Sequence, residues 1–478
     1  MSRYSVSSIS ATALIASSGI DARIEGADRD ITGMTQDSRA VQIGDLYCCI
    51  RGEKFDGHQF AAQAVADGAV ALLVDAPVTG IPESIAIITV PDVRKAIGFF
   101  ASAAFGFPSR SLTMVGITGT NGKTSTAAIV ASILRAAGHV TEVMGTLTST
   151  RTTPEAIDLQ AALRGNVDKG VTHMVMEVSS HALAQCRVSG VLYDVAIFTN
   201  ISRDHLDYHK TDEAYFAAKA QLFTSELSRH GVINSDDPHG RLLLDVAPIP
   251  MTAFALGDAS NVAVRVDSVS FQWRGLNIAL SMGGGFTLIN ALGAVTACAV
   301  LGISDEAIIE GCAQLGQVPG RFESVPNDVG IAVVVDYAHT PDGLREVIAS
   351  ARAICTGRVI VVFGCGGDRD AGKRPLMGHA ADEADILYVT SDNPRGEDPL
   401  AIIEAIVAGV TKSTDAVHKE VDRAIAIASA ISVAQRDDIV VIAGKGHEAT
   451  QEVAGVQHPF NDVDVASSAL SHKKGSQL

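Results

Sequence analysis

Charged and aromatic side chains are scarce in this chain of 478 residues. Charged residues make up 19% of it and aromatic residues 5%, whereas hydrophobic residues make up 47%. A disordered, collagen-like or coiled-coil protein needs a different balance, so the composition excludes these classes. One hydrophobic core stops growing well below this length, and we expect about three domains at roughly 150 residues each.

Positive charge is in deficit as well. The chain has 54 Asp and Glu against 37 Lys and Arg, which leaves a formal net charge of −17. An acidic surface repels phosphodiester polymers and anionic lipid, so we expect no nucleic-acid partner and no membrane partner. If the ligand is itself anionic, basic side chains must gather around it locally.

Cysteine patterns and long hydrophobic runs are also missing. The seven cysteines fit neither a disulfide framework nor a metal-binding spacing, which indicates free thiols in a reducing compartment. Serines interrupt the apolar residues of segment 1–20, where a signal peptide has a continuous apolar core, and the apolar stretch 291–303 is shorter than the ~20 residues that span a bilayer. We therefore expect a soluble, cytoplasmic protein, and we expect it to be a monomer.

The chain does contain a series of apolar, β-branched runs. Each run is followed by a Gly-containing turn and then by an Ala- and Leu-rich segment. This pattern is typical of parallel strands buried on both faces, with helices crossing between them, and it predicts an α/β fold. Ligands in such sheets bind at the carboxyl ends of strands. The predicted strands lie in the runs 69–75, 112–119, 173–180, 195–202, 331–338, 358–367, 386–394 and 438–447.

Two short Pro-containing segments mark the expected domain boundaries. Residues 107–110 precede the first strong strand-loop-helix unit, and residues 318–321 separate a helical stretch from a new β-α series. The expected domains are 1–110, 111–317 and 318–478. We expect the last eight residues, 471–478, to form a frayed tail.

A glycine-rich loop gives the strongest chemical signal. Residues 118–124 read TGTNGKT and stand between a predicted strand and a predicted helix, the context of a phosphate-binding loop. Gly119 and Gly122 allow the backbone N–H groups to turn toward phosphate oxygens, and the start of the helix adds partial positive charge. Lys123 supplies a cation for the phosphates, and the hydroxyl of Thr124 is a potential Mg²⁺ ligand.

The spacing of this loop departs from the usual G-x-x-x-x-G-K-[ST] motif. Ile117 stands at the position of the first glycine, with Gly116 and Gly119 on either side. A chance Gly-Lys-Thr in an ordinary turn is the alternative, but the strand-loop-helix context favours nucleotide binding. The predicted ATP-binding residues of the loop are Gly119, Thr120, Asn121, Gly122, Lys123, Thr124 and Ser125.

Two further residues are ambiguous when considered alone. Glu177 ends the run 173–180, where it could hold Mg²⁺ beside the phosphates or be an ordinary carboxylate at a strand end. Lys219 lies in an Ala-rich helical segment, DEAYFAAKAQLF, where a lone lysine is normally a solvated surface residue.

The loop TGTNGKT resembles that of the ATP-dependent Mur ligases, which add amino acids to the peptidoglycan precursor, and of their folylpolyglutamate synthetase relatives. Further motifs that resemble this family follow in the same order over nearly the full chain. The resemblance implies three domains: a UDP-binding N-terminal domain (1–110), a central P-loop ATPase domain with a parallel sheet (111–317) and a Rossmann-like C-terminal domain that binds the amino acid (318–478).

The resemblance also implies a metal site and a modified lysine. In the family, the lysine of a segment similar to YFAAKAQLF reacts with CO₂ to give a carbamate, N6-carboxylysine, and Lys219 occupies that position. Thr124, Glu177, His205 and carbamylated Lys219 would hold two Mg²⁺, and Lys123, Glu177, His205 and Lys219 would be catalytic. Asn290, Arg321 and Asp336 match further ATP-binding positions, although Phe286-Thr287 replaces the usual Phe-Asn beside Asn290.

Similar matches imply the other substrates. Positions that bind UDP-MurNAc-L-Ala-D-Glu correspond to Ser38, Glu53, Lys54, Phe55, Thr152, Thr153, Ser179, Gln185 and Arg187. The segment SDNPRGEDP resembles the motif of the family members that add meso-diaminopimelate, whose second carboxylate an arginine can grip bidentately. The implied diaminopimelate-binding residues are Arg369, Asp392, Asn393, Pro394, Arg395, Gly444 and Glu448.

The implied reaction is ATP-dependent amide synthesis. The D-Glu carboxylate is phosphorylated by ATP, and an amine of diaminopimelate then attacks the acyl phosphate. Two alternatives stay open: the same chemistry with L-lysine or ornithine as the added residue, and a regulatory P-loop protein in which nucleotide hydrolysis drives a conformational switch.

Overall fold

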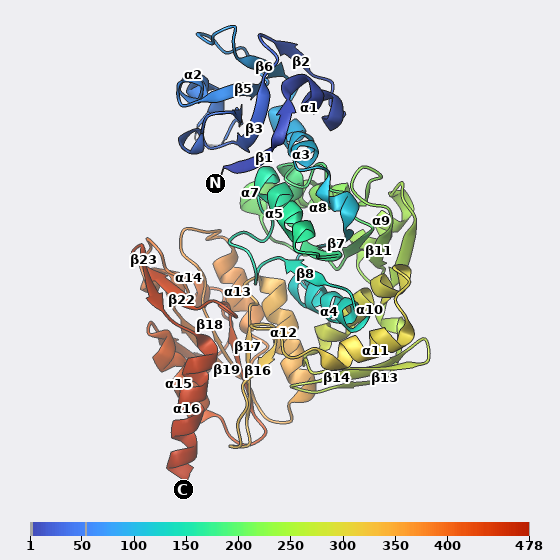
Figure 1. Ribbon diagram of the computed structural model, residues 1–478. Coiled ribbons are helices and arrows are strands. Elements are labelled where there is room, and N and C mark those ends of the chain that lie inside the picture. Colours follow the sequence, from blue (N-terminus) through green and yellow to red (C-terminus); the bar gives the residue numbers. More distant parts are fainter. Residues whose placement is uncertain (1–2, 53–54, 478) are drawn as a thin grey trace.

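The computed structural model describes residues 3–52 and 55–477. It is an α/β protein built on three six-stranded sheets that follow one another along the chain (Figure 1). The first sheet lies at one end of the molecule, the second in the centre and the third beside it. All eight predicted strands are present, and the predicted α/β class is confirmed.

The N-terminal sheet has four parallel strands flanked at its edges by antiparallel ones. Helices α1 (Ala11–Ser18), α2 (Ala61–Ala66) and α3 (Val93–Ala104) belong to this unit. The strand order is β1 (Tyr4–Ser10), β3 (Asp30–Thr35), β4 (Asp45–Cys48), β5 (Ala69–Val74), β6 (Ala86–Thr89) and β2 (Arg23–Glu25).

The central sheet is parallel throughout and is buried on both faces. Along β7, Val115 and Ile117 face one apolar core and Met114 faces the other, which explains why the sequence run is apolar without interruption. Gly116 belongs to the same strand, where a Cβ would lie 2.8 Å from the ring of Tyr193. The order is β12 (Met251–Phe254), β11 (Gly231–Asn234), β10 (Val195–Phe198), β7 (Thr113–Thr118), β9 (His173–Glu177) and β8 (Thr141–Met144).

Helices cover both faces of this sheet. On one face α4 packs against α10 and α11, and a three-stranded antiparallel sheet closes the same core. That small sheet was not predicted. The elements are α4 (Lys123–Ala136), α5 (Ala156–Asp168), α6 (Ser180–Ala184), α7 (Leu206–His209), α8 (Asp212–Ala220), α9 (Pro238–Val246), β13 (Ala259–Val264), β14 (Val269–Trp273), β15 (Leu276–Leu280), α10 (Gly285–Val300) and α11 (Asp305–Gln314).

The third sheet is parallel except for the short edge strand β16, and it also has an apolar core on each face. A hairpin of β22 (Thr450–Val453) and β23 (Val456–Pro459) follows it. The order is β16 (Glu323–Ser324), β17 (Ala332–Asp336), β21 (Ile439–Ala443), β18 (Val359–Phe363), β19 (Ile386–Thr390) and β20 (Val417–Glu420). The helices are α12 (Pro341–Ile354), α13 (Lys373–Ala381), α14 (Pro399–Val407), α15 (Arg423–Val433) and α16 (Asp462–Gln477).

The expectation of a frayed C-terminal tail is wrong. Helix α16 continues to Gln477, and Lys473 Nζ donates to the carbonyls of Ser432 and Ala434 at 2.9 and 2.8 Å. These bonds tie the polar end of the chain to the end of α15. A polar composition therefore did not exclude a docked helix.

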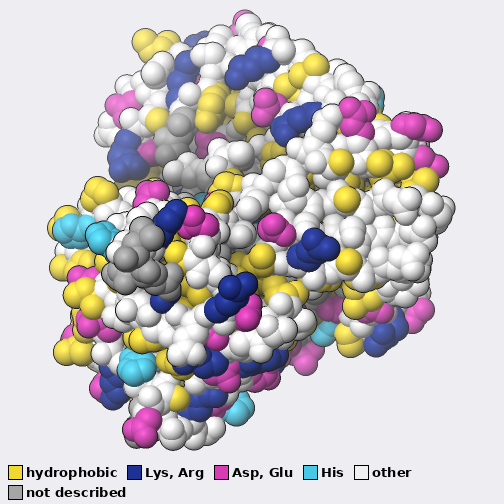
Figure 2. All heavy atoms as spheres, turned by 90° about the horizontal axis from the view of Figure 1, so that it is seen from below, with side chains coloured by type: hydrophobic (Ala, Val, Ile, Leu, Met, Phe, Trp, Pro, Cys, Tyr) yellow, Lys and Arg dark blue, Asp and Glu magenta, His cyan; other side chains and the backbone are white. Residues whose placement is uncertain are grey.

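The structure describes the cysteines, the length of the helices and the distribution of surface charge. All seven cysteines are free. Within residues 3–52 and 55–477, no helix combines the length and the apolar character that a bilayer span requires. On the face seen from below, acidic and basic side chains are interspersed (Figure 2), so this view shows no continuous basic track.

A fully buried ion pair joins two helix starts in the C-terminal part. Arg423, at the first turn of α15, donates to both carboxylate oxygens of Asp462 at 2.8 Å and to the carbonyl of Ala443 at 2.9 Å. Neither side chain of the pair is exposed. Loss of one partner would leave an uncompensated buried charge, which typically costs about 3–5 kcal/mol.

We expect Asp462→Ala to lower the melting temperature by on the order of 10 °C, because each kcal/mol corresponds to about 2–4 °C at this domain size. Differential scanning calorimetry measures it. Glu404→Ala is the matched control, since it removes an exposed ion pair with Lys419 and should shift the melting temperature only slightly. Equal shifts in both variants would contradict the structural importance of the buried pair.

Candidate functional site

The carboxyl ends of β7, β9 and β10 in the central sheet, and of β17 in the C-terminal sheet, border one cavity of about 400 Å³. This is the edge where the sequence predicted a ligand. The cavity brings together all the residues predicted to bind ATP or metal: Gly119, Thr120, Asn121, Gly122, Lys123, Thr124, Ser125, Glu177, His205, Lys219, Asn290, Arg321 and Asp336.

The glycine-rich loop passes from β7 into α4 under tight steric limits. A Cβ on Gly119 would lie 1.8 Å from Thr199 Oγ1, and a Cβ on Gly122 would lie 2.2 Å from Asn290 Oδ1. Gly122 also has a φ of +85°, in the left-handed region that favours glycine. Both glycines are therefore required by the local packing as well as by the motif.

Residues that directly follow β10 form hydrogen bonds with this loop. The backbone N–H of Asn121 donates to Asn200 Oδ1 at 2.9 Å, and Thr199 Oγ1 donates to the Asn121 carbonyl at 2.6 Å. Thr120 Oγ1 lies 3.0 Å from the hydroxyl of Tyr215 on α8. Sequence reasoning missed these supporting residues, because their role depends on contacts between segments about 80 to 95 positions apart.

Two lysines meet at the start of the loop. Lys123 Nζ donates to the carbonyls of Gly119 and Thr120 at 2.8 Å, and Lys219 Nζ donates to the same Gly119 oxygen at 2.8 Å. Lys219 is 1% exposed, so it is not the solvated surface lysine that its helix suggested as an alternative. Burial, and next the neighbouring Lys123, hold the pKa of Lys219 well below its usual value.

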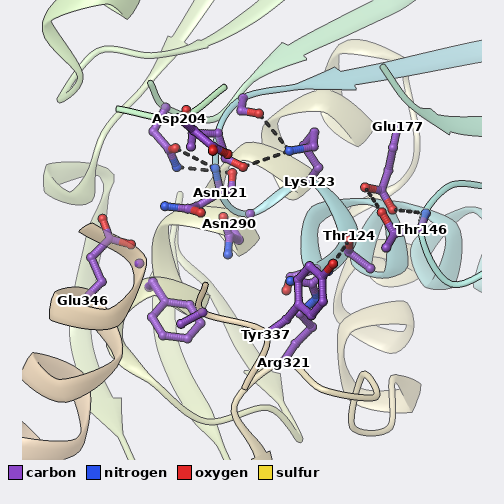
Figure 3. A pocket seen from close by; sticks show the side chains of 18 of the residues that line it. Asn121, Lys123, Thr124, Thr146, Glu177, Asp204, Asn290, Arg321, Tyr337 and Glu346 are labelled. Atoms are coloured by element: carbon purple, nitrogen blue, oxygen red, sulfur yellow. Dashed lines mark hydrogen bonds between the residues drawn. The ribbon is translucent and has the colours of Figure 1, made fainter. Parts of the chain in front are cut away.

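Glu177 lies at the end of β9, on the wall of the cavity (Figure 3). Its two carboxylate oxygens accept from the backbone N–H and the hydroxyl of Thr146, at 3.0 and 3.1 Å. Thr146 Oγ1 also lies 3.1 Å from Thr152 Oγ1. This chain of contacts links Glu177 to the threonines predicted to bind the sugar-nucleotide dipeptide.

His205 follows β10 with a φ of 54° and faces several other rings. Its Nε2 lies 3.3 Å from Asp204 Oδ2, and its ring lies 4.6 Å from that of His181. Burial lowers the pKa of His205 to about 4, so its imidazole is neutral near pH 7. A neutral imidazole has a lone pair available for a metal ion.

The residues predicted to hold Mg²⁺ differ in how well their side chains suit this ion. Glu177, His205 and Thr124 supply a carboxylate, an imidazole and a hydroxyl, and the parts of the chain that the structure describes hold no cluster of three or more His, Cys, Asp or Glu side chains suited to a metal. Mg²⁺ prefers oxygen ligands. A lysine offers none, so the set fits Mg²⁺ well only if Lys219 carries a carboxylate group.

The C-terminal sheet contributes the opposite wall of the cavity (Figure 3). Arg321 reaches the start of α4, where it donates to Thr124 Oγ1 at 2.9 Å, and its guanidinium lies 4.8 Å from the ring centre of Tyr337. Both Asp336 oxygens accept backbone N–H groups, those of Phe322 and Ala338, at 2.7 Å. Asp336 is thus committed to shaping the loops around Arg321.

One more acid faces the cavity from α12. Burial, and next the charges of Asp342 and Asp336, raise the pKa of Glu346 to about 7. In Figure 3 the side chain of Glu346 lies at the opposite end of the view from Glu177, with Asn290 between them. No motif singled out this residue, since one glutamate on an amphipathic helix is normally solvated.

The residues predicted to hold the dipeptide form a network beside Glu177. Thr153 Oγ1 donates to the Glu177 carbonyl at 2.9 Å and lies 3.4 Å from Ser179 Oγ. The guanidinium of Arg187 donates to Gln185 Oε1 and to the Thr153 carbonyl. Arg151 and Arg187 also form ion pairs with Glu155, a residue that the sequence did not single out.

Two of the four predicted UDP-binding positions, Ser38 and Phe55, are described by the structure, and both belong to the N-terminal unit. Ser38 begins a short 3₁₀ helix, Ser38–Ala40, and Phe55 has 70% of its side chain exposed. Glu53 and Lys54 lie outside the described residues. Neither Ser38 nor Phe55 is among the residues that line the cavity described above.

The predicted diaminopimelate-binding residues also lie close together. Asn393 Nδ2 donates to Glu448 Oε2 at 2.8 Å, and a Cβ on Gly444 would lie 2.6 Å from Asp392 Oδ2. Arg395 donates to the Gly367 carbonyl at 2.7 Å. A Cβ placed on Gly367 would lie 2.0 Å from the carbonyl oxygen of Pro394. Arg369 is exposed, and its Cγ would lie 3.8 Å from a Cβ placed on Gly366.

Three family models match successive segments of the chain. The model "Mur ligase family, catalytic domain" matches residues 30–104, "Mur ligase middle domain" matches residues 117–298, and "Mur ligase, glutamate ligase domain" matches residues 320–446.

Curated relatives match at similar extent. A protein of Gloeobacter violaceus is 43% identical over 96% of this chain and 98% of its own, and one of Syntrophomonas wolfei is 42% identical over 93% and 96%. Both are named UDP-N-acetylmuramoyl-L-alanyl-D-glutamate--2,6-diaminopimelate ligase.

Solved structures share the fold. One ligase with that same name is 34% identical and matches with a TM-score of 0.67, covering 93% of this chain and 96% of its own. The MurF ligase of Thermotoga maritima in complex with ADP matches with a TM-score of 0.64, at 20% identity over 93% and 98% of the two chains.

We expect Gly122→Ala to weaken binding of a fluorescent ATP analogue about tenfold to a hundredfold, because the added Cβ would collide with Asn290 and overpacking costs about 1–3 kcal/mol. Titration in the presence of Mg²⁺ measures the affinity. Gly138→Ala is the control: Gly138 follows the same helix with the same φ of +85°, but a Cβ there meets nothing within 4 Å. Similar losses in both variants would show that backbone strain, rather than the contact with Asn290, governs binding.

Proposed function

The chain belongs to the Mur ligase family, and on that premise we propose that it joins meso-diaminopimelate to UDP-MurNAc-L-Ala-D-Glu at the expense of ATP. The observation that carries this proposal is the cavity in which the glycine-rich loop, Glu177 and Arg321 face one another. Near-full-length similarity to relatives named as this ligase supports it.

The proposed reaction has two steps. A D-Glu carboxylate oxygen takes the γ-phosphoryl group of ATP, and ADP leaves. The amine of diaminopimelate then attacks the acyl carbon, phosphate leaves, and an amide remains. Backbone N–H groups of the loop and the start of α4 would bind the phosphates, and Lys123 and Arg321 would balance the charge that develops during transfer.

Thr124, Glu177, His205 and carbamylated Lys219 would hold Mg²⁺, which when bound offsets phosphate charge. The low pKa of Lys219 supports the carbamate, since only the neutral amine attacks CO₂. In that step the nitrogen forms a bond to carbon and loses one proton. Lys219 would have to leave the Gly119 carbonyl to present the new carboxylate.

The remaining roles follow the same division. We assign residues 1–110 to UDP binding, 111–317 to ATP binding and 318–478 to amino-acid binding. The network of Thr152, Thr153, Ser179, Gln185 and Arg187 would bind the dipeptide part of the sugar nucleotide. Arg395 and Arg369 would bind the far carboxylate of diaminopimelate, which lysine lacks.

One assay tests the proposal directly. Amide formation from UDP-MurNAc-L-Ala-D-Glu is measured with diaminopimelate, lysine and ornithine in parallel, and we expect product with diaminopimelate at far lower concentration than with the others. Preference for lysine or ornithine would reassign the third residue. Phosphate release independent of both the amino acid and the sugar nucleotide would favour a nucleotide-driven switch instead.

We expect Lys219→Ala to lower kcat on the order of 100-fold, because it removes the carboxylate that the modified lysine would supply. Added formate or acetate should restore part of the activity, and intact-protein mass spectrometry of the wild type should show one added CO₂. Lys169→Ala, at an exposed position after α5, is the control and should keep full activity. Full activity of Lys219→Ala would remove the carbamate from the mechanism.

A further inference from the structure

A buried lysine contacts two of the residues proposed to bind the amino acid. Lys445 follows β21 and has no exposed surface. Its Nζ donates three hydrogen bonds: to Asn393 Oδ1 at 3.1 Å, to Glu448 Oε2 at 2.9 Å and to the Thr450 carbonyl at 2.7 Å. An ammonium has three N–H groups, so Lys445 is fully occupied and cannot itself touch a ligand.

The partners of Lys445 are two of the residues assigned to amino-acid binding. Asn393 Oδ1 accepts from Lys445 and from the backbone N–H of Glu452 at 2.9 Å, and Asn393 Nδ2 donates to Glu448 Oε2. The amide orientation of Asn393 is thereby fixed. Glu448 Oε2 is occupied twice, by Lys445 and by Asn393.

One polar atom of this group stays available. Glu448 is partly exposed, and among residues 3–52 and 55–477 no hydrogen-bond donor contacts its Oε1. A carboxylate oxygen held in this way accepts a hydrogen bond from an ammonium or amine group. The incoming amino acid carries such groups.

Lys445 also balances charge in a crowded acidic site. Asp392 is buried beside it, and burial raises the pKa of Asp392, an effect that Arg423 and Lys445 oppose and Glu448 reinforces. Removal of Lys445 would leave Glu448 and Asp392 facing each other with less compensation. The two carboxylates would repel, and Glu448 would no longer be held in one rotamer.

We propose that Lys445 is a positioning residue that fixes Asn393 and Glu448 for recognition of the amine-bearing part of the third-residue amino acid. The inference deepens the proposed function and rests on it. Lys445 acts only through these two side chains, so its loss should affect the amino acid and spare ATP and the sugar nucleotide.

The test compares KM values for all three substrates in Lys445→Met, which keeps an unbranched side chain one atom shorter but removes the charge and the hydrogen bonds. We expect KM for diaminopimelate to rise about tenfold to a hundredfold, since hydrogen bonds to charged groups contribute about that factor. KM for ATP and for UDP-MurNAc-L-Ala-D-Glu should stay within about twofold. Lys445→Gln, which retains donors without the charge, should show a smaller rise.

Lys419→Met serves as the matched control, because Lys419 forms an exposed ion pair with Glu404 in the same sheet unit. It should leave all three KM values unchanged. An unchanged KM for diaminopimelate in Lys445→Met, or an equal rise for all three substrates, would overturn the inference. Failure of both Lys445 variants to fold would show a structural role instead and would overturn it as well.

The wild-type enzyme distinguishes a failure of the proposed function from a failure of the role proposed for Lys445. If wild type does not ligate diaminopimelate, the proposed function fails before Lys445 is considered. If wild type ligates it and Lys445→Met behaves like wild type, the function stands and only the positioning role is lost.

Discussion

The site depends on two lysines that share one backbone oxygen. Lys123 and Lys219 both donate to the Gly119 carbonyl at 2.8 Å, in a loop whose glycines pack against Thr199 and Asn290. Two ammonium groups this close in a buried site repel each other, which favours loss of a proton from one of them. Lys219, which is 1% exposed, has its pKa lowered well below the usual value, by burial first and by Lys123 next. The packing that forms the glycine-rich loop therefore also favours the neutral form of the Lys219 amine.

The same cavity connects two parts of the chain that the sequence separates by almost 200 positions. Arg321 donates to Thr124 Oγ1, and Tyr337 lies beside Arg321 and, at 5.2 Å between ring centres, beside His447. His447 precedes Glu448, which is bonded to Lys445 and Asn393. One aromatic ring thus lies between the residues proposed to bind phosphate and those proposed to bind the amino acid. If Thr124 gains another partner and Arg321 moves, the ring of Tyr337 loses or changes its contact with the guanidinium. Tyr337 also lies beside His447, so the change would reach the residues around Glu448.

The sequence predicted the strands and the loop that have a local residue pattern. The eight apolar runs became strands because each lies in a sheet buried on both faces, and residues 118–124 became the loop between β7 and α4. The antiparallel strands β13 to β15 were missed, because β14 and β15 alternate between buried and more exposed positions, whereas the continuous apolar runs that predicted the other strands are typical of strands buried on both faces. Lys445, Glu155 and Glu346 were missed for a different reason. Their surroundings come from segments far apart in the chain, and a charged residue has no local signal that it will be buried.

Most cations proposed to bind an anionic substrate already have a protein acceptor. Arg187 is bonded to Gln185, Thr153 and Glu155, Arg395 to Gly367 and Glu452, and Arg321 to Thr124. In a chain with a net charge of −17, these partners keep each guanidinium in place and prevent repulsion between neighbours. Substrate binding would then exchange one acceptor for another rather than neutralise a free charge. Such an exchange lowers the net gain in affinity, but it holds the binding groups in a defined geometry before the substrate arrives.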